Sequence, residues 1–121
     1  MLITSGYNFE GYRITGYLGF CSGECALGTG FLSSFGAGIA DLLGTNSSMY
    51  EEKLNEARKH ALDSLMSDAS ALGADALIAV DVDYTVFSAD IVGVTANGSA
   101  VTIGKELDGR DYPPVCLDIK N

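Results

Sequence analysis

Hydrophobic and polar positions follow two different periods along this chain. Residues 2–5 and 12–27 are rich in Ile, Tyr, Phe and Thr and carry several glycines, which predicts two strands. Residues 76–87 form another β-branched run that alternates in its second half, and residues 91–103 return after a short loop at 88–90. Asn97-Gly98 fits a two-residue hairpin turn, but the continuity of the last run favours a bulge there.

Two intervening segments have helical spacing. Apolar residues recur every three or four positions within residues 30–44, which predicts a short helix ending at Gly44. The pattern Ser48-Met-Tyr-Glu51 is a capping box, and it opens a longer apolar repeat that ends at Gly73. The second segment therefore predicts a long helix, of about 36 Å.

The second strand is apolar on both faces. Simple alternation places on one face Tyr17, Gly19, Cys21, Gly23, Cys25 and Leu27, and on the other Leu18, Phe20, Ser22, Glu24 and Ala26. Glu24 is also the one charged residue between Ile14 and Ala40, and seven glycines interrupt this segment, so it does not fit a membrane span. We expect part of it to lie in a subunit interface.

Composition narrows the possible partners. The chain has 121 residues, enough for one domain, and a net charge of −9 that disfavours nucleic acids and anionic membranes. The start of the chain lacks the pattern of a signal peptide, which predicts a cytoplasmic protein. Three cysteines in that reducing compartment argue against structural disulfides.

Cys21 and Cys25 are the first candidates for chemistry. Four residues of extended strand separate their α-carbons by about 13 Å, whereas two sulfurs on one zinc ion lie about 4 Å apart. Buried, structural thiols are therefore favoured over a site within one chain. Copies of Cys21 or Cys25, with Glu24, could still hold a thiophilic metal such as zinc or copper between subunits.

The remaining polar candidates have less specific patterns. Glu24 could be a ligand between subunits, or it could pair with Arg13 or Arg58. Asp81 and Asp83 share a strand face and suit either a hard cation or a solvated edge. His60, the one histidine, is expected at the surface, and the sequence shows no familiar catalytic pattern, so we expect no enzyme activity.

In the order of these motifs, the chain resembles the YbjQ-like family, whose members are described as heavy-metal-binding proteins. The resemblance covers residues 1–104 and depends on YLGFCSGECALG, GIADLLG, the long SSMYEEK…VDVDY stretch and VTANGSAV. It implies an α+β fold with two layers, an antiparallel sheet backed by one short and one long helix, in a ring-forming homo-oligomer of five subunits. The residues that match the family most specifically, and that we assign to ligand or interface roles, are Gly23, Tyr50, Asp81, Asp83 and Tyr84.

Two classes of function follow. The preferred one is a non-catalytic assembly or small-ligand-binding protein whose partner is another copy of itself. The alternative is a metal-binding or metal-responsive protein that uses Cys21, Cys25 and Glu24. Residues 105–121 lie outside the resemblance, and we expect them to add an edge strand or to clasp a neighbouring subunit.

Overall fold

The computed structural model describes residues 1–27, 47–88, 91–106 and 109–110. Its elements are β1 (Leu2–Ile3), β2 (Tyr12–Leu27), α3 (Ser47–Ala71), β3 (Ala76–Ser88) and β4 (Ile91–Lys105). The long helix and the three long strands confirm the elements expected from the sequence. The short helix expected within residues 30–44 lies outside the described residues.

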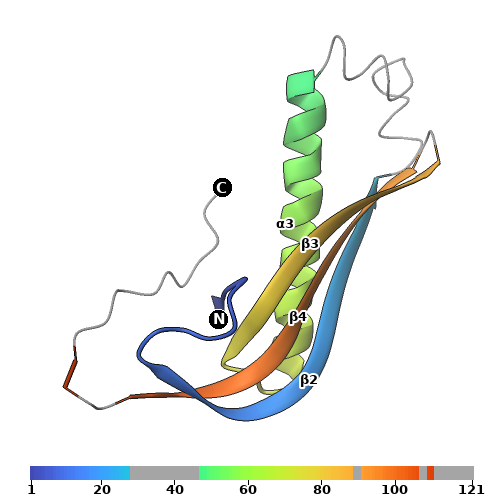
Figure 1. Cartoon of the computed structure of the whole chain (residues 1–121). Helices are drawn as coiled ribbons and strands as arrows, with labels where there is room; N and C mark the ends of the chain where they lie inside the picture. Colours follow the sequence, from blue (N-terminus) through green and yellow to red (C-terminus); the bar gives the residue numbers. More distant parts are fainter. Residues whose placement is uncertain (28–46, 89–90, 107–108, 111–121) are drawn as a thin grey trace.

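The described strands form one four-stranded sheet, in the order β1-β3-β4-β2, with α3 packed along one face (Figure 1). β4 is antiparallel to both β2 and β3, but β1 runs parallel to β3. The expected all-antiparallel sheet is therefore wrong at this edge. β1 has two residues, and the long connection through β2 and α3 lets it pair in either direction.

The face of the sheet under α3, which we call the covered face, is lined by small and aliphatic side chains. Ala61 and Leu65 of α3 are fully buried against Leu77, Val94 and Ala96. Gly73 ends the helix region with a φ of 82°, in the left-handed conformation that glycine adopts most easily. Among the described residues, no helix is long and apolar enough to cross a membrane.

Four irregularities interrupt the strand register among the described residues, one of them at Phe87 near the end of β3. In β2, Thr15 and Leu18 are extra residues relative to β4, and in β3 the pair Ala79-Val80 lies opposite Gly98 alone. Ala79 has a φ of 52°, and its N–H donates to the carbonyl of Gly6. Residues 97–98 continue β4 without a turn, and the bulge lies across from them in β3.

The bulge at Leu18 changes which side chains share a face. It places Tyr17 opposite Val101, on the face away from α3, whereas Cys21 lies on the covered face. The expectation that Tyr17 and Cys21 share a face is therefore wrong, because each extra residue reverses the alternation. We call the face away from α3 the outer face; it carries Tyr17, Phe20, Glu24, Asp81 and Asp83.

Candidate functional site

Cys21, Glu24 and Cys25 lie on one strand but do not meet. β2 is extended from Gly19 to Leu27, so Cys21 and Cys25 lie on the covered face and Glu24 on the outer face. Cys21 is buried, Cys25 is half-buried and Glu24 is exposed. One subunit therefore does not bring these three side chains to a common centre.

Gly23 lies between the two cysteines and has a packing role. A Cβ atom built there would collide with the backbone of α3, at the carbonyl of Ala61 and the N–H of Leu65. The glycine lets the helix approach β2 more closely than any side chain would allow. This close approach is what buries Cys21 beneath α3.

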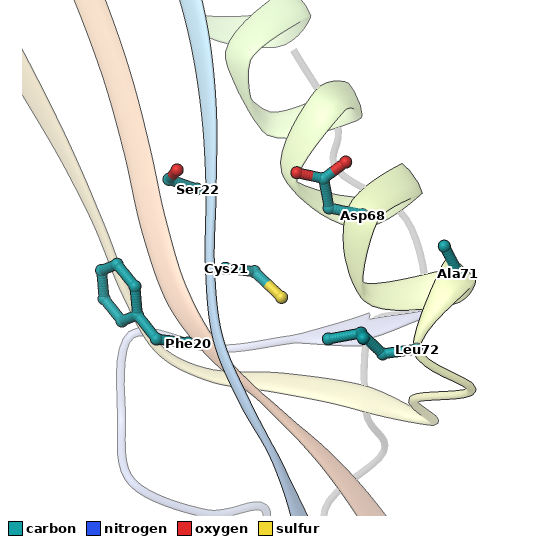
Figure 2. Close-up of a pocket in the computed structure, with 6 residues that line it drawn as sticks. All are labelled: Phe20, Cys21, Ser22, Asp68, Ala71 and Leu72. Carbon is teal, nitrogen blue, oxygen red and sulfur yellow. The ribbon is translucent and has the colours of Figure 1, made fainter.

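Cys21 lies in a groove between β2 and the last turns of α3. The groove has a volume of about 330 Å³ and is lined by Phe20, Cys21, Ser22, Asp68, Ala71 and Leu72. Figure 2 shows the sulfur of Cys21 directed towards the helix, with Asp68 and Leu72 directed towards β2. Among the described strands β2 is an edge of the sheet, so the groove lies beside backbone groups that none of these strands pairs.

The electrostatics of the groove keep the thiol neutral. Burial raises the pKa of Cys21, and the nearby carboxylate of Asp68 raises it further. A protonated thiol is a poor nucleophile and a poor metal ligand. Cys21 therefore fits a packing role within one subunit, and a metal ion bound there would have to displace its proton.

The donor set for a metal ion is also small. Within the ranges that the structure describes, no group of three or more His, Cys, Asp or Glu side chains could hold a metal ion. Cys21 and Asp68 supply two possible ligands, whereas a structural zinc ion takes four. A complete site would need ligands from another subunit.

Three carboxylates, those of Glu24, Asp81 and Asp83, lie at neighbouring positions of the strand register on the outer face. Glu24 and Asp83 lie on either side of Thr95, and Ser22 and Asp81 lie on either side of Asn97. A hydrogen bond with Asp81 raises the pKa of Asp83, and the negative charge of Asp81 raises it further. These exposed acids form a negatively charged patch at this end of the sheet.

A second groove, smaller than the one beside Cys21, lies between two of the segments that resemble the family. It has a volume of about 260 Å³ and is lined by Glu51, Leu54 and Asn55 of α3 and by Tyr84 of β3. Tyr50 lies in the same first part of α3, but its side chain is outside the described residues. His60 is exposed on α3, as expected.

Sequence reasoning missed Asp68 and Leu72 as neighbours of Cys21. Helical spacing could have indicated Asp68, because it follows the buried residues Ala61 and Leu65 by seven and three positions and so lies on the same side of the helix. A charged residue on the apolar side of a helix indicates a gap beside the sheet. The edge position of β2, which creates that gap, depends on strand order and has no local signal.

Comparison with known proteins identifies relatives along most of the chain. The family described as "Putative heavy-metal-binding" (YbjQ) matches residues 1–104. A UPF0145 protein of Carboxydothermus hydrogenoformans is 36% identical over 107 residues, covering 88% of this chain and 100% of the relative. A UPF0145 protein of Bifidobacterium longum is 39% identical over 107 residues, covering 87% of this chain and 97% of the relative.

The fold also matches a crystal structure. That protein, from Pediococcus pentosaceus, is described as having unknown function and belonging to the DUF74 family. The TM-score is 0.55 with 19% sequence identity, and the match covers 86% of this chain and 98% of the other. At this identity the likeness supports the α+β fold alone.

Proposed function

Because this chain belongs to the YbjQ-like family, we propose that it is a cytoplasmic, non-catalytic protein that assembles into a homo-oligomeric ring of five subunits. The outer face of the sheet carries the contact with the next copy. Small ligands bind in the clefts that assembly creates between subunits.

The main support for this proposal is the exposure of large aromatic side chains on the outer face. Tyr17 is 75% and Phe20 is 73% exposed, although both lie in the middle of a long strand. Phe9 packs with Val101 and Ile78 on the same face, but that cluster leaves the two aromatics of β2 uncovered. Adjacent exposed aromatics of this kind are typical of protein interfaces.

A second candidate function is the binding of a thiophilic metal between subunits. Cys21 lies beside β2, the edge strand among those described, where a second copy could add ligands to the two that the described residues supply. The negative charge of Asp68 disfavours a thiolate at Cys21, but the same charge attracts a cation. Zinc and copper(I) are the metals that suit such a thiolate site.

Native mass spectrometry of the reduced protein, purified without a histidine tag, tests both candidates. Assembly predicts ions of five subunits before any metal is added, and a protein that stays monomeric at all concentrations would contradict it. Metal binding predicts a fixed number of zinc or copper(I) ions per ring. That uptake must disappear in the Cys21→Ala, Cys25→Ala double variant and persist in a Cys116→Ala variant, which keeps both cysteines of β2.

A further inference from the structure

The groove beside Cys21 combines an apolar wall with one charged side chain. Leu72, which is 49% exposed, and Ala71 supply aliphatic surface from α3. Asp68 is the one charged group among the six lining residues, because the raised pKa of Cys21 keeps that thiol neutral. A volume of about 330 Å³ lies in the range of small-molecule sites. These features suit a cation that carries an apolar group.

The carboxylate of Asp68 is available to such a cation. The ion pair between Lys53 and Glu56 lies about three turns before Asp68 on α3. Among the residues that the structure describes, no ion pair or side-chain hydrogen bond involves Asp68. The net charge of −9 attracts cations to the chain in general, so the choice of one particular cation must come from the groove.

The spacing of Asp68 and Leu72 sets the length of the ligand. The two residues are four positions apart on α3, and Cβ atoms at that spacing lie about 6 Å apart on one side of a helix. Figure 2 shows both side chains directed towards β2, on either side of the level of Cys21. A ligand whose charge lies at Asp68 and whose tail lies along Leu72 therefore needs a chain of about four carbons.

Neither part of such a ligand would bind well alone. Asp68 is exposed, and an ion pair with an exposed carboxylate changes affinity by only about threefold. Each methylene that becomes partly buried against Leu72 adds about a further twofold. Affinity therefore requires the charge and the aliphatic chain together.

We propose that this groove binds a small primary alkylammonium compound with a chain of about four carbons, whose ammonium group lies at Asp68 and whose chain lies against Leu72. All the residues that line the groove belong to one subunit, so this site goes beyond the assembly proposed above and does not depend on it. The ligand also leaves the thiol of Cys21 protonated, whereas a metal ion bound there would displace its proton.

Methyl NMR titration of the reduced, full-length protein with n-butylammonium, at fixed ionic strength and neutral pH, tests this site. The methyl resonances of Ala71 and Leu72 should shift and saturate, with a dissociation constant in the millimolar range. 1-Butanol, which has the same chain without the charge, should bind about threefold more weakly. Ethylammonium, which lacks two of the methylenes, should bind about fourfold more weakly.

Two variants separate the charge from the chain. Asp68→Asn should remove the preference for butylammonium over 1-butanol, and Asp63→Asn, which has the same net charge, should keep it. Leu72→Ser should reduce the advantage of butylammonium over ethylammonium while keeping the preference for the charged ligand. Equal losses in Asp68→Asn and Asp63→Asn would overturn the proposal, as would methyl resonances of Ala71 and Leu72 that do not shift.

A dication distinguishes this site from general attraction to an acidic protein. Butane-1,4-diammonium should bind more weakly than butylammonium, because its second charge would lie against Leu72. Tighter binding of the dication would overturn the proposal.

A lysine side chain has the same chemistry as a free alkylammonium compound. Tighter binding of Nα-acetyl-lysine methylamide than of butylammonium would assign the groove to a protein side chain and overturn a free amine as its ligand. Native mass spectrometry of the same variants should show an unchanged oligomer, so a failure of this site and a failure of assembly give different results.

Discussion

The two faces of the sheet differ sharply, although the same strands supply both. The covered face presents small residues to α3, and Gly23 and Ala96 lie where helix and sheet approach most closely. The outer face presents large aromatics and acids, with Tyr17 and Phe20 more than 70% exposed. The covered face buries its centre against α3 within one subunit, whereas the outer face leaves large aromatic side chains exposed, as surfaces that bind a partner do. This difference separates the residues that we expect to determine stability from those that we propose to determine assembly.

The largest expected effect is at Gly23 on the covered face. Gly23→Val should lower the free energy of unfolding by about 3 kcal/mol, because its side chain would overlap the backbone of α3 rather than a movable side chain. Guanidinium unfolding followed by circular dichroism, at a fixed subunit concentration, measures the change. Ala26→Val is the control, since Ala26 is exposed on the outer face and its change should stay within about 0.5 kcal/mol. Equal losses in the two variants would remove the distinction between the faces.

The next effect concerns assembly rather than unfolding. Tyr17→Ser with Phe20→Ser should reduce the oligomer to the 12.6 kDa subunit, because these are the large apolar side chains exposed on the outer face. Sedimentation equilibrium gives the mass, and the circular dichroism spectrum should be unchanged. Tyr7→Ser is the control, since Tyr7 is 84% exposed but lies in the loop before β2. An intact oligomer in the double variant would refute the role of the outer face.

The periodicity of apolar residues in the sequence was sufficient to predict the long helix and the long strands. The strand over residues 12–27 and the helix that ends near Gly73 were expected from alternation, helical spacing and a glycine stop, and they are present. A bulge was expected at Asn97-Gly98, and a bulge lies there, but its extra residue belongs to the opposite strand, at Ala79-Val80. The bulge at Leu18 could not be placed, because a bulge depends on which residue of the neighbouring strand lies opposite. One such bulge moved Tyr17 to the outer face and so changed which residues form the candidate interface.

The candidate site was less predictable than the fold. The spacing of Cys21 and Cys25 correctly indicated that one extended strand keeps them apart. The proximity of Cys21 to Asp68, which are 47 residues apart in the chain, depends on packing, and the edge position of β2 among the described strands depends on strand order. The parallel pairing of β1 with β3 was likewise unpredictable, because β1 has only two residues and their sequence carries no information on strand direction.

A smaller effect is expected inside the groove on the covered side. Asp68→Asn should lower the pKa of Cys21, because it removes a negative charge that disfavours the thiolate. The pKa should remain above the ordinary value for cysteine, since burial, the larger cause, is unchanged. Thiolate absorbance against pH, in a background with Cys25→Ser and Cys116→Ser, measures the shift. A rise in the pKa would contradict this account, and Asp63→Asn on α3 serves as the charge-matched control.

The smallest effect tests the acids of the outer face. Asp81→Asn should lower the pKa of Asp83, because Asp81 raises it by a hydrogen bond and by charge repulsion. A carboxyl group whose pKa is raised by folding favours the folded state most at low pH, and that contribution is lost as the pH rises through the folded pKa. The substitution should therefore weaken the dependence of stability on acidification in that range. Carbon-13 NMR titration of the Asp83 carboxyl group measures the shift directly. Both carboxyl groups are exposed, so the change in stability should be small, and an unchanged pKa would show that the two acids do not interact in solution.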